Sequence, residues 1–302
     1  MNCINQTNGK NFSLFHGDCV EVMSGLPSQS VDYSIFSPPF ASLYTYSNSP
    51  RDMGNVRNDA EFFEHFDFLV AELARVMKPG HNVSFHCMLM PTSKERDGYI
   101  GLKDFRGELI RAFQKHGFIY ASEVCIWKDP VTSMQRTKAL GLLHKTVRTN
   151  ACMSRQGIPD YLVTMRAPGE MMDKVTHTPE TYPVDKWQKV ASPVWMDINP
   201  NDTLQFRSAR EHDDERHICP LQLEVIRRGI DLWTNPGDVV LSPFTGIGSE
   251  GFVALEMGRK FVGAELKDSY FKQASANLLM AEKEQAQGLF APDEPEELSE
   301  AA

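Results

Sequence analysis

A glycine-rich turn late in the chain constrains the fold more than any other feature. Gly246, Gly248 and Gly251 follow the apolar run Val239–Leu241 and open a helical stretch. This is the Gly-x-Gly-x-x-Gly spacing of a nucleotide-binding strand-to-helix turn. Only 37 of the 302 residues follow Glu265, which ends the next apolar run. A sheet built around this turn must therefore be completed by strands from earlier in the chain.

A second strand-to-turn boundary lies near the start of the chain. The apolar run Val31–Phe36 predicts a buried strand, and it stops at the tetrapeptide Ser37-Pro38-Pro39-Phe40. Two consecutive prolines offer no N–H to a sheet, so the chain must leave the strand here. By itself the tetrapeptide is consistent with a turn that only ends a strand. A permuted sheet, however, would bring it to the same carboxyl edge as the glycine turn, and ligands bind at that edge in open α/β sheets.

Hydrophobic periodicity divides most of the remaining chain into strands and helices. We expect strands at 12–16, 82–90, 118–127, 161–165, 239–241 and 261–264, with a shorter one near 193–198. We expect helices at 19–23, 59–77, 105–116, 220–233, 252–257 and 270–282. This alternation predicts an α/β fold. Asp18 would lie at the first strand-to-helix turn, where its carboxylate could serve a ligand or cap the helix.

Two irregular stretches interrupt the regular pattern. Residues 128–158 are basic and polar, and residues 168–216 are irregular and contain five prolines. Between them, a strand near 161–166 returns to the core. We interpret 128–216 as an insert that confers specificity on a regular α/β core.

Charge is distributed unevenly along the chain. The formal net charge is −9, but residues 128–166 carry seven basic residues against two acidic ones. A basic stretch in an acidic protein can follow phosphates, although a solvated surface face is an equally good explanation. The acidic end, 286–302, predicts a disordered tail. Our candidates for nucleic-acid contacts are Arg136, Lys138, Lys145, Arg148 and Arg155.

Other residue patterns narrow the class of protein. The six cysteines form no Cys-x-x-Cys pair, so we expect neither a metal centre nor a disulfide framework. We see no apolar run of the roughly 18 residues that a membrane helix needs, and no secretion signal. We therefore expect a cytoplasmic protein that does not enter a membrane. His65, His86 and His116 lie on separate predicted elements, and we interpret all three as structural.

Taken together and in this order, the motifs resemble those of the beta group of S-adenosylmethionine-dependent DNA amino-methyltransferases, in which the catalytic half precedes the cofactor half. The resemblance covers roughly 12–127 and 217–280. One departure is Ser242, where the family usually has Asp. The motifs that carry the resemblance are Gly17-Asp18, Val31-Asp32, Ser37-Pro38-Pro39-Phe40, Lys78-Pro79-Gly80, His217-Ile218-Cys219-Pro220-Leu221-Gln222, Ser242-Pro243-Phe244-Thr245-Gly246-Ile247-Gly248 and Glu265-Leu266.

The resemblance implies a doubly wound, mostly parallel, Rossmann-like methyltransferase sheet with a permuted order of motifs. Its expected parts are a catalytic half at 1–127, a target-recognition insert at 128–216, a cofactor half at 217–285 and the tail. S-adenosylmethionine would be held by Asp18 on the adenine, by Glu265 on the ribose and by the Phe244–Gly248 loop on the methionine side. The full candidate set for cofactor binding is Asp18, Ser37, Pro220, Ser242, Phe244, Thr245, Gly246, Gly248 and Glu265. For Thr245 and Pro220, capping or starting a helix is the competing explanation.

The expected reaction explains why the tetrapeptide matters. An exocyclic amine on a base is a poor nucleophile because its lone pair is delocalised into the ring. Acceptors aimed at its N–H bonds, here the Ser37 hydroxyl and the Pro38 carbonyl, would free that pair, while Pro39 fixes the backbone and Phe40 stacks on a flipped base. In the family, Ser at the first position is associated with N4 of cytosine, and Asp or Asn with N6 of adenine. We therefore expect N4-cytosine methylation of double-stranded DNA, with N6-adenine as the alternative.

Two other classes of function compete with this expectation. A methyltransferase-like module weakened at Ser242 could bind DNA without catalysis. The glycine spacing alone would also fit a nicotinamide oxidoreductase, although we identify no hydride-handling site. For the methyltransferase, residues 128–158 and 170–216 are the expected base-reading surface, and a cognate restriction nuclease is a candidate partner.

Overall fold

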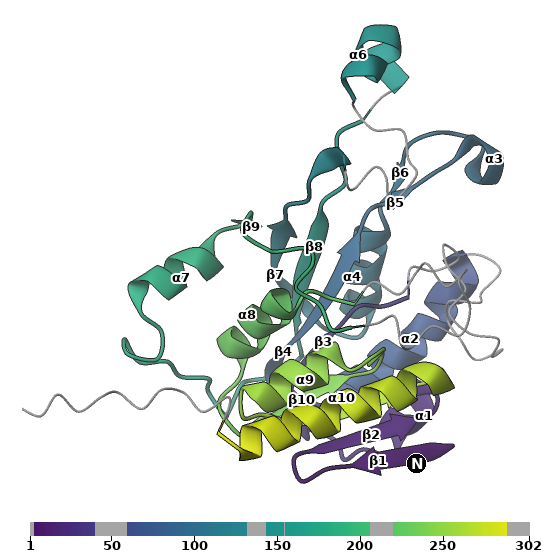
Figure 1. The fold of residues 1–302 in the computed structure, drawn as a ribbon. Coiled ribbons are helices and arrows are strands. Elements are labelled where there is room, and N and C mark those ends of the chain that lie inside the picture. The colour runs from purple at the N-terminus through teal and green to yellow at the C-terminus, as the bar shows by residue number, and fades with distance from the viewer. Residues whose placement is uncertain (1–2, 40–58, 132–142, 154, 206–219, 289–302) are drawn as a thin grey trace, which may run out of the picture.

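The computed structural model describes residues 3–39, 59–131, 143–153, 155–205 and 220–288. Phe40, Arg136, Lys138 and the tail beyond Gly288 lie outside these ranges. In the described part, helices cover both faces of one large sheet (Figure 1). None of the described helices is both long and apolar enough to cross a membrane.

Within the described ranges, nine strands form the main sheet, in the order β1-β2-β11-β10-β3-β4-β8-β7-β9. A separate two-stranded sheet pairs β5 (Met90–Pro91) with β6 (Leu102–Lys103). The strands of the main sheet are β1 (Asn5–Asn8), β2 (Phe12–His16), β3 (Val31–Phe36), β4 (Met77–Met88), β7 (Ile119–Ile126), β8 (Asp160–Arg166), β9 (Val194–Trp195), β10 (Val239–Ser242) and β11 (Lys260–Glu265).

The sheet is permuted in the way that the late glycine turn requires. β10 and β11, from the end of the chain, lie between β2 and β3, from its beginning. β2, β11, β10, β3 and β4 all run parallel to one another. β8 runs antiparallel to both β4 and β7, and β1 antiparallel to β2. The prediction of a mostly parallel α/β sheet is confirmed.

Two helical layers bury the two faces of the sheet. α1 (Cys19–Ser24), α2 (Asp59–Val76) and α4 (Phe105–Lys115) share one hydrophobic core with the strands. α8 (Leu223–Trp233), α9 (Ser249–Glu256) and α10 (Asp268–Ala286) share the other. β3 contributes to both because side chains alternate along a strand: Tyr33 and Ile35 face the second core, and Phe36 the first. The sheet is thus doubly wound.

β4 begins earlier than the sequence indicates. The sequence predicts a start at Asn82, after a helix-stopping Lys78-Pro79-Gly80, but the strand already pairs at Met77 with Val31. An irregularity in the register between Val31 and Tyr33 accommodates the proline and glycine, and Gly80 has a left-handed φ of 74°. A bulge of this kind lets a strand continue through residues that would break a regular ladder.

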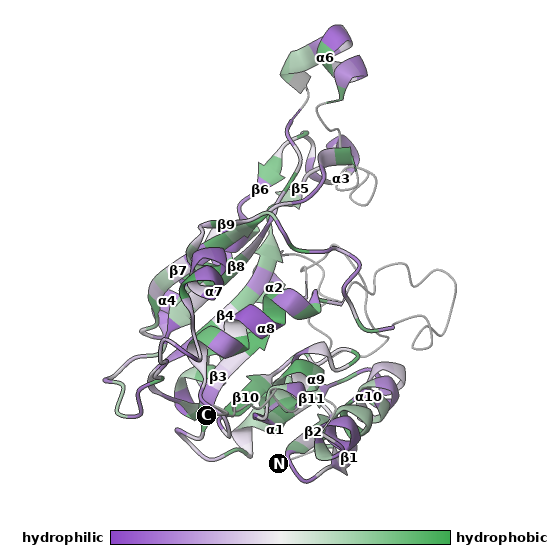
Figure 2. Ribbon diagram, turned by 60° about the vertical axis from the view of Figure 1, so that its left-hand side comes forward, coloured by the Kyte–Doolittle hydropathy of each residue, from purple (hydrophilic) through white to green (hydrophobic). Residues whose placement is uncertain are grey.

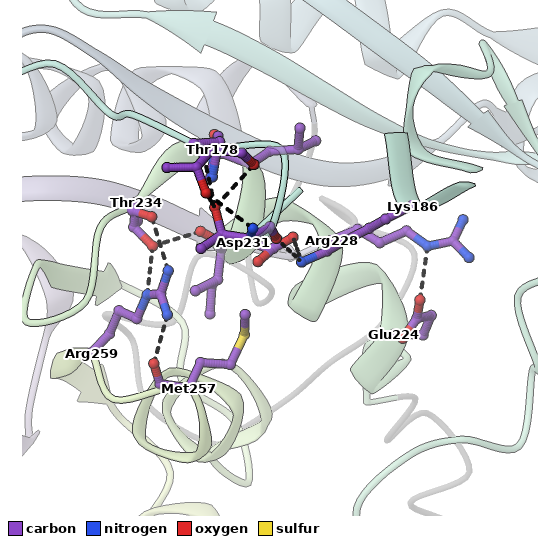
Figure 3. A network of polar contacts seen from close by, with 12 residues as sticks. Thr178, Lys186, Glu224, Arg228, Asp231, Thr234, Met257 and Arg259 are labelled. Carbon is purple, nitrogen blue, oxygen red and sulfur yellow. Dashed lines mark hydrogen bonds and ion pairs between the residues drawn. The ribbon is translucent and has the colours of Figure 1, made fainter. Parts of the chain in front are cut away.

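Ion pairs connect α8 to neighbouring segments of the chain (Figure 3). Arg228 pairs with Glu224 on its own helix at 2.9 Å and with Asp197 at 2.6 Å. Lys186, on α7 (Val184–Ala191), pairs with Asp231 at 2.8 Å. Trp195 of β9 is buried in the same core as α8. The segment from α7 to β9 therefore belongs to the folded body, although the sequence groups it with the insert.

α6 (His144–Asn150) contrasts with these packed elements. The helix has no buried residue, and Figure 1 shows it, followed by the 3-10 helix η3 (Ala151–Met153), standing away from the sheet. Figure 2 colours β10 largely hydrophobic and α6 largely hydrophilic. A short α3 (Lys94–Asp97) lies beside the β5–β6 pair. These elements extend from the end of the sheet at which β3, β4 and β7 finish.

Candidate active site

The serine turn and the glycine turn share one edge of the sheet. β3 and β10 are parallel neighbours, with Tyr33 opposite Val240 and Ser34 opposite Leu241. Parallel neighbours end at the same edge, so the turns that follow them lie side by side. The rings of Phe36 and Phe244, one beside each turn, are 5.7 Å apart between centroids. The juxtaposition expected from the permuted order is present.

Ser37 stands at the end of β3 with its side chain partly exposed. Pro38 is buried and Pro39 is partly exposed, so the turn packs against the protein. Ser37 Oγ lies 3.2 Å from Nδ1 of His86 on β4. The hydroxyl is thus in contact with a side chain from the neighbouring strand.

His86 is the site residue that the sequence does not reveal. Its sequence context predicts only a structural histidine, but its Nε2 lies 2.8 Å from Asp160 Oδ2, and Lys128 pairs with the same oxygen. Asp160 is buried at the start of β8. Burial alone would raise the pKa of this carboxyl, but His86 and Lys128 together hold it below its ordinary value. The chain Ser37–His86–Asp160–Lys128 joins four separate segments.

The backbone of the glycine turn needs residues without a side chain. Gly246 and Gly248 have left-handed φ angles of 55° and 93°. A Cβ at Gly248 would lie 3.3 Å from the Cα of Ala274, and one at Gly251 would lie 2.5 Å from a methyl carbon of Leu278. The first two glycines therefore shape the turn, and the second and third let α9 approach α10. These roles match those of a nucleotide-binding turn.

Glu265 ties the glycine turn to the end of β2. Its Oε2 accepts a hydrogen bond from Gly246 N at 2.8 Å, and its Oε1 accepts one from Lys267 N at 2.8 Å. Its backbone carbonyl accepts from Gly17 N at 3.0 Å. These contacts orient the carboxylate at the edge of the sheet.

Asp18 caps the first helix. Its Oδ1 accepts from Val20 N at 2.9 Å and from Glu21 N at 3.1 Å, which makes it the N-cap of α1. Asp18 therefore caps the helix, which is one of the two roles that the sequence allows for its carboxylate. The side chain is partly exposed and lies beside Gly17, so the cap holds it at the same edge as Glu265.

Two buried polar atoms without partners among the described residues belong to strand and helix ends that face this edge. Ser242 is fully buried, and its Oγ makes no hydrogen bond within the described residues; the same is true of Gln222 Oε1 at the start of α8. An unpaired buried polar group costs about 1–3 kcal/mol, so each favours a ligand that would pair it. Pro220, two residues before Gln222, is partly exposed.

Thr245 has a structural role in the loop. The side chain is buried, and its Oγ1 donates to the carbonyl of Ser242 at 3.1 Å. The backbone N–H of Thr245 donates to Ala264 O at 3.0 Å. The threonine therefore closes the turn and holds it against β11. The competing explanation of a helix cap does not hold for Thr245, because the N-cap of α9 is Gly248.

Glu250 is a buried acid in the first turn of α9. Burial, with a smaller contribution from the charge of Glu265, raises the pKa of its carboxyl to about 8. A neutral carboxyl below that pH limits the negative charge that gathers around the glycine turn. The sequence offers no sign of this, because the residue sits in an ordinary helical position.

The expected nucleic-acid contacts fall in different environments. Lys145 and Arg148 are exposed on α6. Arg155 is partly buried, its Nε lacks a partner among the described residues, and burial lowers its pKa. Arg136 and Lys138 lie outside the described ranges. Exposed basic residues on a protruding helix fit contact with phosphates better than does the half-buried Arg155.

Residues 173–176, which belong to the expected base-reading surface, lie at a different edge of the sheet from Ser37. Lys78 Nζ, near the start of β4, lies 3.4 Å from Asp173 Oδ2. Asn235, in the turn that precedes β10, bonds to Thr176 N and to Lys174 O at 3.3 Å each. These partners lie at the amino ends of the parallel strands. Residues 173–176 therefore occupy the edge opposite Ser37, because β8 runs antiparallel to β4 and delivers the chain to that edge.

The sequence matches a known family over most of its length. The profile of the N6/N4 DNA methylases matches residues 31–276. Among curated proteins, the chain is 25% identical over 262 residues to the type II methyltransferase M.BglII of Bacillus subtilis, covering 85% of this chain and 66% of that protein. It is 25% identical over 288 residues to the DNA adenine methyltransferase YhdJ of Escherichia coli (strain K12), covering 92% of this chain and 86% of that one.

Solved structures share the fold. The PvuII DNA methyltransferase, described as cytosine-N4-specific, superposes with a TM-score of 0.65 at 16% identity and covers 95% of this chain and 97% of its own. TTHA0409 of Thermus thermophilus, solved with S-adenosyl-L-methionine, gives a TM-score of 0.63 at 22% identity and covers 89% of this chain and 95% of its own. The permuted sheet, the two turns at one edge and the extent of the family match lead to one conclusion: the chain belongs to the N6/N4 DNA methylase family.

Proposed function

We propose that this protein methylates N4 of cytosine in double-stranded DNA and takes the methyl group from S-adenosylmethionine. The observation that carries the proposal is the position of Ser37 and the glycine turn on adjacent parallel strands, with Phe36 against Phe244. The carboxyl edge of the sheet can then receive a base on the β3 side and a nucleoside cofactor on the β10 side.

The residues at the edge fit S-adenosylmethionine. Glu265 would accept hydrogen bonds from the ribose, as a carboxylate at the end of this strand does in nucleotide-binding folds. Asp18 would face the adenine, and the backbone from Phe244 to Gly248 would line the methionine part. The unpaired Ser242 Oγ would gain a partner there. When bound, the cofactor would supply an activated methyl group on a sulfonium.

The serine turn would act on the amine of the base. Ser37 Oγ and the Pro38 carbonyl would each accept an N–H of the exocyclic amine and draw its nitrogen away from the plane of the ring. The consecutive prolines fix the backbone, so the carbonyl needs little reorganisation. The base must leave the duplex to reach this turn. A close in-line arrangement of nitrogen and methyl group would then account for much of the acceleration.

Two observations bear on the choice of base. The serine at the first position of the tetrapeptide favours cytosine, and the cytosine-N4-specific PvuII enzyme shares the fold. The sequence similarity to an adenine methyltransferase favours the alternative, N6 of adenine. We keep cytosine as the proposal because a neutral hydroxyl can accept from the amine of cytosine while other groups donate to its ring acceptors.

The proposal is tested by incubating the protein with mixed-sequence duplex DNA and methyl-labelled cofactor, then digesting the DNA to nucleosides. We expect the label in N4-methylcytosine. Label only in N6-methyladenine would replace the proposed base with the alternative, and no label in any nucleoside would reject the activity. If calorimetry also detected no cofactor binding, a DNA-binding protein without catalysis would be the better description.

The Ser37→Ala variant tests the mechanism. We expect cofactor binding to persist and the methylation rate to fall at least about 100-fold, because a preorganised acceptor is removed. Ser24→Ala, which removes an exposed hydroxyl in α1 that donates to the Glu21 carbonyl, is a control and should act as wild type. A Ser37→Ala protein with wild-type turnover would remove Ser37 from the mechanism.

A further inference from the structure

We infer that His86 is a positioning residue that orients the hydroxyl of Ser37 as a hydrogen-bond acceptor toward the base. This inference rests on the proposed function, since it gives the serine turn a substrate amine to face. It is carried by two contacts: Ser37 Oγ to His86 Nδ1 at 3.2 Å, and His86 Nε2 to Asp160 Oδ2 at 2.8 Å.

The contact with Asp160 determines which ring nitrogen carries the hydrogen. A carboxylate can only accept, so His86 Nε2 must be the donor. We take the imidazole to be neutral, in which case Nδ1 has a lone pair and no hydrogen. The hydroxyl hydrogen of Ser37 therefore points to Nδ1, and both lone pairs of its oxygen are left for an N–H of the substrate.

Asp160, a buried residue, holds the His86 ring in this orientation. Asp160 is 2% exposed, and its pKa lies below the ordinary value despite burial, so the group is a carboxylate at neutral pH. Lys128 binds the same Oδ2 and balances its charge. The pair can thus direct the hydrogen bond of His86 without a net charge beside the imidazole. The His86 side chain is 12% exposed, which limits its freedom to rotate.

Lys128 and Asp160 lie at the two ends of one segment of the chain. Lys128 follows β7 and Asp160 begins β8, and the chain between them carries α6 with Lys145 and Arg148. Asp160 is therefore fixed in the sheet and Lys128 lies two residues beyond the end of β7, at the base of the region that we expect to contact DNA. This makes the orientation of Ser37 dependent on the folded core rather than on the position of the protruding helix.

A purely structural histidine would use the same contacts differently. It would need only to donate a hydrogen bond to Asp160, and the protonation of its Nδ1 would not depend on Ser37. His116, which bonds Asp67 Oδ1 through Nε2 at 3.0 Å, is a histidine of that kind and serves as the matched control.

The first experiment measures the tautomer by 15N NMR on the free protein, with the His86 signals assigned by their loss in His86→Gln. We expect a protonated Nε2 and an unprotonated Nδ1, and a shift of the Nδ1 resonance in Ser37→Ala. The His116 resonances should not respond to Ser37→Ala. A proton on Nδ1, or a His86 Nδ1 resonance that ignores Ser37→Ala, would overturn the inference. Because this readout needs no activity, it separates failure of the inference from failure of the proposed function.

The second experiment is a double-mutant cycle on single-turnover methylation. We expect His86→Ala to lower the rate about 100-fold with unchanged cofactor affinity, as a misoriented acceptor does. Adding it to Ser37→Ala should lower the rate no further, because both changes remove the same oriented hydroxyl. His116→Ala should react at the wild-type rate. Independent, multiplying effects of the His86 and Ser37 variants would contradict the inference.

Discussion

Ser242 is a buried residue whose hydroxyl group lacks a hydrogen-bond partner within the described residues. The resemblance leads us to expect an aspartate at this position, and a carboxylate in a fully buried position would need a charged partner. The serine fits the space, but its hydroxyl has no partner within the described residues. The residue therefore adds little to the stability of the free protein, and its hydroxyl remains available to a bound cofactor.

Ser242→Ala should weaken S-adenosylmethionine binding by about 10-fold, the value of one hydrogen bond of roughly 1.4 kcal/mol. The melting temperature of the free protein should stay the same or rise, because an unpaired buried hydroxyl is removed. Calorimetric titration and thermal unfolding measure the two effects.

Ser34→Ala is the matched control for this change. Ser34 is equally buried, but its Oγ donates to the carbonyl of Leu241 at 2.9 Å. We expect the control to become less stable and to keep its cofactor affinity. Unchanged affinity in Ser242→Ala would exclude the serine from the cofactor site.

Glu250 should make stability depend on pH. The carboxyl keeps its proton up to about pH 8 in the folded protein, against an ordinary pKa of 4.5. Folding therefore takes up a proton between these values, and the free energy of unfolding falls as pH rises through that window, by at most about 1.4 kcal/mol per pH unit. Urea unfolding at about pH 5.5 and about pH 8 should show this slope in wild type and a flatter one in Glu250→Gln. Equal slopes in the two proteins would mean that Glu250 is ionised when folded.

At the scale of elements, the regular strands are the easiest to predict. Phe12–His16 and Val31–Phe36 lie at the positions that the sequence predicts, because each is a short apolar run ended by glycine or proline. The start of β4 and the placement of 173–176 do not follow from the sequence, because both depend on which strand lies alongside. The pattern does not predict α6 as a helix at all: it buries nothing, so it leaves no hydrophobic period to detect.

α6 should contribute to DNA affinity through charge. The Lys145→Ala Arg148→Ala double variant should reduce the slope of log affinity against log salt by about 0.9 for each phosphate that is no longer neutralised. Lys174→Ala is the control, since Lys174 is exposed at the opposite edge of the sheet and should leave the slope unchanged. A double variant with the wild-type slope would exclude α6 from binding phosphates.

At the scale of the whole molecule, neither half of the permuted sheet is complete without the other. β10 and β11 separate β2 from β3, so residues 1–127 alone would leave β2 and β3 without their partners in the centre of the sheet. Unpaired central strands expose backbone donors and apolar faces that only the C-terminal strands cover.

We therefore expect fragment 1–127 to lack a cooperative thermal transition by circular dichroism, and to gain one when mixed with a fragment that spans 128–302. The matched comparison is the full chain cut by protease after folding, which should keep its transition because the strands are already paired. A cooperative transition in the isolated N-terminal fragment would contradict the interdependence of the two halves.

The sequence by itself determined the two turns, their permuted order and hence the family. A strand followed by Pro-Pro or by Gly-x-Gly can leave the sheet in few ways, and such constraints act within a few residues. Only the tertiary structure decided that His86 contacts Ser37, which lies 49 positions away, and Asp160, which lies 74 away. Those contacts depend on the pairing of β3, β4 and β8, and strand pairing is set by packing across the whole sheet, which no local pattern encodes.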